Sequence, residues 1–164
     1  MTLPVQSLRA APEHRDVLRT VARMLREGGA DELRRLLSQR AAQPVGPFRS
    51  EAAALAFLRD RLVSALRPRM IWLFGSRARG KARLDSDFDL LVVLPDGLPD
   101  SAYGHPAVAE PVSGCGVGHD IVPCSWSAYL AERKEVGSLV HRAVSEGRLI
   151  YRDRQLRRAG ARAA

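Results

Sequence analysis

Cysteines, aromatic residues and long apolar runs are all scarce in this sequence, and each scarcity excludes a class of protein. Only Cys115 and Cys124 are present, too few for a disulfide framework or a cysteine-rich metal cluster. Apolar runs such as Met70 to Phe74 are far shorter than the roughly 18–20 residues of a membrane-spanning helix. The opening segment MTLPVQSLRAAPEHR lacks the apolar stretch of a secretory signal. We therefore expect a cytoplasmic protein with reduced thiols and no membrane partner.

Positive charge is concentrated at the two ends of the 164 residues, whose net charge is +8. Residues 1–50 hold nine Arg against five acidic residues, and residues 151–164 hold five Arg against one Asp. The twelve basic and twelve acidic residues between them cancel. A basic end can bind nucleic acid by neutralising phosphates. No stacking aromatic residues interleave these basic runs, so nucleic acid is a partner that the charge allows but that we do not favour.

Hydrophobic periodicity divides the chain into a helical beginning and a mixed remainder. It predicts helices over 13–27 and 30–40, a linker over 43–47, and a third helix that Ser50 caps and that Pro68 ends. Residues 95–118 hold five Gly and four Pro, so we expect them to be mostly irregular. The remaining expected elements are strands over 70–74, 88–94, 119–124 and 149–151, and helices over 127–135 and 137–146. This order is typical of a layered α+β or α/β domain.

The most informative stretch, GSRARGKARLDSDFDL, begins at Gly75 directly after the first expected strand. A glycine there permits a tight turn and a close approach of backbone to ligand. Ser76 can donate its hydroxyl and its N–H to a phosphate, and a helix that starts at Ser76 would point further N–H groups at the anion. Arg77 and Arg79 follow as counter-charges, with two more basic residues after them. The stretch therefore predicts a nucleotide-binding turn.

Paired carboxylates close the same stretch. Asp87 and Asp89 are two apart on an expected strand, so their side chains share one face while Phe88 and Leu90 point to the buried side. Two carboxylates this close repel each other unless a cation lies between them, and hard oxygen ligands select Mg²⁺ or Mn²⁺. If the third strand lies beside this one, Asp120 reaches the same face, where it can bind a metal or accept a proton from an attacking hydroxyl.

These residues resemble the signature of the DNA polymerase β-type nucleotidyltransferases, which is Gly-Ser, ten intervening residues and then Asp-x-Asp. The chain is most similar to the minimal nucleotidyltransferase (MNT) branch, which includes antitoxins paired with HEPN-type ribonuclease toxins. The resemblance implies a polymerase β-like α+β fold, with a small mixed sheet and flanking helices, and transfer of AMP from ATP with two Mg²⁺ ions. The motif residues that carry over are Gly75, Ser76, Asp87, Asp89 and Asp120.

The resemblance also implies an organisation for the chain. We expect an N-terminal helical extension over 1–49, a nucleotidyltransferase domain over 50–151 and a basic tail over 152–164. A domain of about 100 residues is too short for an added acceptor-binding domain, so a docking protein is the favoured acceptor: a HEPN-type toxin, adenylylated on a hydroxyl. Three alternatives stay open: a catalytically silent binding antitoxin, an antibiotic nucleotidyltransferase with residues 1–49 as part of the substrate wall, and a nucleic-acid-binding regulator.

Overall fold

The computed structural model describes residues 15–41, 43–83 and 85–153 and divides between Gln43 and Pro44 into two compact units. Residues 44–49, which the sequence analysis assigned to the N-terminal extension, thus belong to the larger unit. Val45 explains why, since it is buried in the core of that unit and pairs with Phe48. The expected basic tail lies outside the described residues from position 154 onward, as do the first two residues of the helix expected over 13–27.

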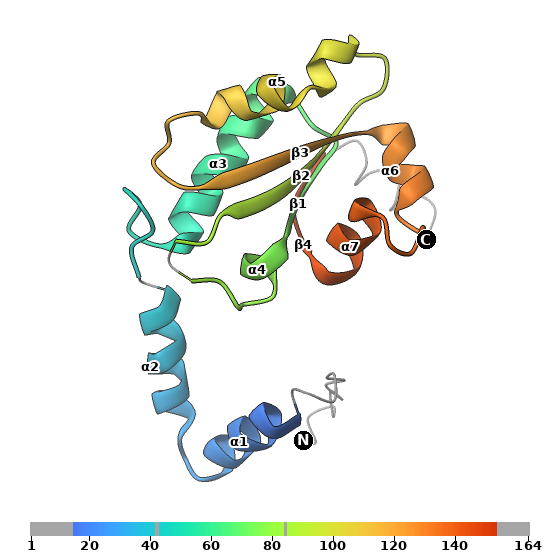
Figure 1. Ribbon diagram of the computed structural model, residues 1–164. Helices are drawn as coiled ribbons and strands as arrows, with labels where there is room; N and C mark the ends of the chain where they lie inside the picture. The colour runs from blue at the N-terminus through green and yellow to red at the C-terminus, as the bar shows by residue number, and fades with distance from the viewer. Residues whose placement is uncertain (1–14, 42, 84, 154–164) are drawn as a thin grey trace. The chain divides into compact units, whose positions relative to one another are not determined.

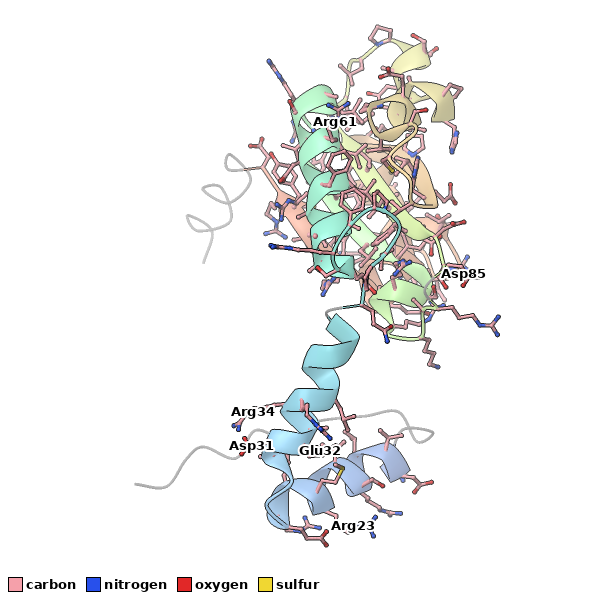
Figure 2. All side chains as sticks on the ribbon, turned by 90° about the vertical axis from the view of Figure 1, so that its left-hand side faces the viewer. Arg23, Asp31, Glu32, Arg34, Arg61 and Asp85 are labelled. Atoms are coloured by element: carbon pink, nitrogen blue, oxygen red, sulfur yellow. The ribbon has the colours of Figure 1, made fainter. Side chains whose placement is uncertain are left out.

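The smaller unit consists of two helices, α1 (Arg15–Arg26) and α2 (Ala30–Ala41), close to the expected ranges. Gly28, with φ +83°, lies in the turn between them, in a left-handed conformation that favours glycine after a helix. Ion pairs along the helix surface support α2, among them Arg34 to Asp31 at 2.6 Å between Nη1 and Oδ1 (Figure 2). No residue of α1 is buried, so its apolar side chains add little to a core.

The larger unit begins with α3 (Glu51–Leu66), which Ser50 caps by accepting a hydrogen bond from the Ala53 N–H at 3.1 Å. None of the described helices is both long and apolar enough to cross a membrane. The elements that follow are β1 (Met70–Phe74), α4 (Gly75–Ala78), β2 (Phe88–Leu94), η2 (Asp100–Tyr103), α5 (His105–Ala109), η3 (Glu110–Val112), β3 (His119–Ser125), α6 (Trp126–Glu132), α7 (Leu139–Glu146) and β4 (Arg148–Arg152).

The segment between β2 and β3 is more ordered than its composition predicts. It holds three short helices, η2, α5 and η3, where the sequence analysis expected mostly irregular chain. Two of its prolines, Pro106 and Pro111, lie in the first turns of α5 and η3. Proline is compatible with that position because the N–H it lacks would have no partner there. The expectation of mostly irregular chain, which rested on the Gly and Pro content, was therefore wrong about the helix content of this segment.

The sheet is small and mixed, with strand order β3-β2-β1-β4 (Figure 1). Strand β1 runs antiparallel to both of its neighbours, β2 and β4, whereas β2 and β3 are parallel. The parallel pair needs a crossover connection, which the short helices between β2 and β3 provide. The predicted mixed sheet with flanking helices is thus confirmed.

Helices cover both faces of the sheet, but different ones (Figure 1). On what we call the closed face, α3 and α5 pack over side chains such as Phe88 and Leu90, both fully buried as expected. The opposite face, which we call the site face, carries Leu91 and Val93 under side chains of α6 and α7. Asp89 points to this second face because it alternates with Phe88 and Leu90 along β2.

Candidate active site

The Gly75-Ser76 turn joins β1 directly to α4, one residue earlier than the helix start expected from sequence. Gly75 has φ +69°, a left-handed conformation that side chains disfavour. A Cβ at this position would also overlap the Asp89 carboxylate. Glycine is therefore required here for two reasons, and the turn lies directly against an acidic side chain of β2.

Two strands bring the predicted aspartates together. Asp89 and Asp120 are direct partners in the parallel β2–β3 ladder, so the condition that the sequence analysis set for Asp120 is met. Asp87 precedes β2 by one residue, and its carboxylate lies so close to Gly118 that a Cβ on Gly118 would overlap it. The three acids thus gather where β2 and β3 begin.

The charges of these acids influence one another. Burial raises the pKa of Asp89, and the negative charges of Asp120 and Asp87 raise it further, while Arg79 and Arg77 oppose the rise. A group of like charges around a partly buried carboxylate favours a bound cation or proton. Within the described part of the chain, no three His, Cys, Asp or Glu side chains are close enough to form a complete set of metal ligands as they stand. The oxygen donors are nevertheless of the type that Mg²⁺ prefers.

Arg77 lies differently from what the sequence suggested, which was contact with a nucleotide. Its side chain is only 2% exposed, stacks over the Phe88 ring at 4.0 Å and donates to the Ser86 carbonyl at 3.0 Å and to Glu51 Oε2 at 3.1 Å. The guanidinium therefore ties α4 to α3 and to the loop before β2. Its direct neighbours are parts of the protein, and it acts on Asp89 through its charge.

Ser76 and Arg79 remain available at the mouth of the turn. The Ser76 hydroxyl makes no hydrogen bond to any described residue, and Arg79 is 42% exposed. Arg79 Nη1 lies 3.2 Å from Glu146 Oε2 on α7, an ion pair that is exposed on both sides and therefore weak. Arg79 is also near enough to Asp89 to oppose the rise of its pKa. It is the arginine better placed to meet an anion.

Two neighbours of the aspartates escaped the sequence analysis. His105 begins α5, and its Nε2 lies 3.7 Å from Asp120 Oδ1. Gly118 gives Asp87 the room it occupies. Neither residue stands out in the sequence pattern. His105, for example, reaches Asp120 only because the folded chain brings the two residues together. His119, the histidine next to Asp120 in sequence, instead places its Nδ1 3.0 Å from the Val117 carbonyl.

Comparison with known proteins identifies a family and some distant structural relatives. The model of the nucleotidyltransferase domain family matches residues 56–141, just over half of the chain, including Gly75, Ser76 and the three aspartates. Among curated proteins, none matches the chain.

Two solved structures illustrate the distant relatives. A chain from a toxin–antitoxin crystal structure with AMP-PNP is 22% identical, covering 65% of this chain and 80% of its own, with a TM-score of 0.41. The second is the structure of a tri-AMPylated HEPN toxin of Shewanella oneidensis in complex with an MNT antitoxin. The matching chain of that structure is 21% identical, covering 66% of this chain and 75% of its own, with a TM-score of 0.35. Likenesses this distant assign no substrate and no partner.

Proposed function

This chain belongs to the nucleotidyltransferase domain family, and from that premise we propose that it transfers AMP from ATP to a hydroxyl of a partner protein, as an antitoxin that adenylylates a HEPN-type toxin. The observation that carries the proposal is the meeting of the Gly75-Ser76 turn with Asp89, and of Asp89 with Asp120, at one edge of the sheet. A turn of the kind that can bind phosphate lies there beside acidic groups, and this is the combination that nucleotidyl transfer uses.

Each residue has a role that follows from its position. The Ser76 hydroxyl and the backbone N–H groups of the turn would bind the outer phosphates, and Arg79 would add positive charge to them. Asp87, Asp89 and Asp120 would hold Mg²⁺, as two ions if the resemblance extends so far, and the metal would neutralise the triphosphate. Arg77 would position the turn rather than touch the nucleotide.

The transfer itself exchanges one P–O bond for another. The acceptor hydroxyl attacks the α-phosphorus of ATP, its proton passes to Asp120, and the bond to the bridging oxygen breaks so that pyrophosphate leaves. Asp120 is more than half exposed, so an incoming hydroxyl can approach it. The choice of ATP and of a HEPN-type toxin is supported by the resemblance in sequence and by the small size of the domain.

The test is transfer of label to a HEPN-type toxin, taken from the gene beside the one for this chain if that gene encodes such a protein. Wild-type protein should label the toxin from ATP carrying ³²P at the α-phosphate and not from ATP labelled at the γ-phosphate. The variant Asp87→Asn/Asp89→Asn should lose the labelling while remaining folded, because the substitutions remove repulsion between neighbouring carboxylates. The matched control is Asp60→Asn/Asp85→Asn, which makes the same change in charge at exposed positions, with Asp85 in the same loop (Figure 2).

Each outcome decides between functions. Undiminished labelling by the Asp87→Asn/Asp89→Asn variant would remove the catalytic assignment of these carboxylates. Neutralisation of the toxin by wild-type protein without any labelling would instead favour the silent binding antitoxin. Label from the γ-phosphate alone would indicate phosphoryl transfer and would contradict nucleotidyl transfer.

A further inference from the structure

A pocket of about 580 Å³ opens on the site face, directly beyond the aspartates. Leu91 and Val122 line it, and these two residues are register partners in the β2–β3 ladder. The partners Asp89 and Asp120 lie two residues earlier on the same strands and face the same way. The near end of the pocket is therefore about 7 Å from the candidate active site along the strands, and its far end lies where β2 and β3 end, beside Asp96 and Ser125.

The rim of this pocket is acidic. Asp96, Asp100 and Glu132 line it, and none of them forms an ion pair with any residue between 15 and 153 that the structure describes. Asp96 accepts hydrogen bonds from the Ser127 N–H at 2.9 Å and from the Ser127 hydroxyl at 3.0 Å, which hold its carboxylate at the start of α6. Among the described residues, the negative charge of the pocket thus has no ion-paired cation to balance it.

Cys124, which lines the pocket, is affected by the same negative charges. Its thiol has a pKa raised to about 11, first by burial and then by the charges of Glu132 and Asp96. Apolar side chains contribute the remaining surface, including Leu98, Leu139 and Val140. An apolar floor under an acidic rim suits a long side chain that has a methylene stem and a positive head.

We propose that this pocket binds an Arg or Lys side chain of the acceptor protein and so holds the acceptor hydroxyl over Asp89 and Asp120. The inference rests on the proposed function and adds to it a rule for the acceptor sequence. An extended peptide advances about 3.3–3.5 Å per residue, so a basic residue two or three positions from the hydroxyl residue enters the pocket at its near end. Its stem then runs over Leu91 and Val122 toward the acidic residues at the far end. Binding of this acceptor side chain in the pocket explains how so small a domain can select its acceptor without an added domain.

Blocked peptides provide the test. The probe is acetyl-Arg-Ala-Tyr-amide, compared with the same peptide carrying norleucine in place of Arg, and with agmatine as a free cation. In NMR titrations of the full chain, the Arg peptide should shift the amide signals of Val122, Cys124 and Ala128 and bind about tenfold more tightly than the norleucine peptide at low salt, as expected for two partly exposed ion pairs.

Variants separate the pocket from the general charge of the protein. Asp100→Asn/Glu132→Gln should remove the preference for the Arg peptide, whereas the control Asp60→Asn/Glu135→Gln, equal in charge but outside the pocket, should keep it. Equal binding of the Arg and norleucine peptides, or shifts confined to other parts of the molecule, would overturn the proposal. Agmatine that binds as tightly as the Arg peptide would also overturn it, because the site would then select a free cation rather than a protein segment.

The same titrations distinguish this inference from the proposed function. A nonhydrolysable ATP analogue with Mg²⁺ should bind the Asp100→Asn/Glu132→Gln variant as it binds wild type. If the analogue fails to bind wild type, the nucleotidyl-transfer proposal fails and the pocket inference fails with it. If the analogue binds and α-labelled ATP modifies the toxin, but the peptides show no preference for Arg, only the pocket inference is wrong.

Discussion

The two faces of the sheet are built from alternate residues of the same strands, yet they differ in what covers them. On the closed face, Leu58 and Leu62 of α3 pack against Leu90 and Val92 of β2, and all four side chains are fully buried. On the site face, the same strand presents Asp89 at its beginning and Leu91 on the floor of an open pocket. The even-numbered residues of β2 thus contribute to stability, whereas its odd-numbered residues face the candidate active site and the pocket.

This division allows residues on the site face to be changed at little cost to the stability of the fold. The closed face needs apolar side chains of fitting volume, because any gap there remains unfilled. The site face tolerates carboxylates because its opening gives them water, and in the proposed function a metal, as partners. Substitutions on the two faces should therefore separate stability from activity, and the following predictions test that separation.

Truncation of Leu90 should have the largest effect on stability. Leu90 and Leu91 are adjacent, identical and both 0% exposed, but Leu90 faces α3 while Leu91 faces the pocket. Leu90→Ala should lower the free energy of unfolding by about 2–5 kcal/mol, because it leaves a closed cavity. Leu91→Ala should lower it less, since the space joins a pocket that already exists. Urea unfolding measures both, and equal losses would contradict the difference between the faces.

The next effect belongs to the turn. Gly75→Ala should reduce the rate of transfer about 100-fold, because the new Cβ displaces the Asp89 carboxylate. Gly80→Ala is the control, since Gly80 has nearly the same φ of +68° but a Cβ there would meet nothing within 4 Å. Both variants should lose about 1–2 kcal/mol of stability from the left-handed backbone, and only Gly75→Ala should lose activity. Equal rates in the two variants would contradict a catalytic role for the Gly75–Asp89 contact.

The pattern of the sequence predicted the elements that surround the candidate site because its signals are local. The run Met70 to Phe74, the Ser50 cap and the alternation around Asp89 each depend on near neighbours, and the structure confirms all three. The pairing of Asp120 with Asp89 followed from placing one strand beside another, and the ladder confirms it.

What the sequence could not predict depends on distant contacts. Arg77 was expected to face a phosphate, but Glu51, 26 positions earlier, and the Phe88 ring hold it inside the protein. His105 meets Asp120 only because α5 returns across β3. The acidic pocket joins the end of β2 to α6 and α7, which no local pattern connects. Each of these features arises when separate elements pack together, and so periodicity carries no trace of them.

A smaller effect is expected from the hydroxyl of the turn. Ser76→Ala removes one donor to the triphosphate but keeps the backbone N–H groups, so binding should weaken by about 1.5–3 kcal/mol. Calorimetric titration with a nonhydrolysable ATP analogue and Mg²⁺ gives the affinity. Ser64→Ala, at an exposed position of α3 on the closed face, should change nothing. Identical affinities of Ser76→Ala and wild type would mean that the turn does not hold the phosphates.

The smallest effect should come from the basic end of the chain, because the contacts described for both faces come from residues before 154. Strand β4 extends to Arg152, which pairs with Met70, and the Asp153 N–H donates to the Arg69 carbonyl at 2.9 Å. Removal of residues 154–164 should therefore leave transfer nearly unchanged, whereas removal of 152–164 also shortens the sheet and should cost about 1 kcal/mol of stability.

An ionic-strength series with both truncated proteins completes this last test. The four Arg removed with residues 154–164 act, if exposed, only within a screening length of roughly 8 Å at physiological salt. If they steer an acidic partner, association should slow most at low salt and little at high salt, while the rate of transfer within the complex stays constant. A large loss of transfer that does not depend on salt would mean that the tail forms part of the active site. It would also mean that the site face is not complete without residues beyond β4.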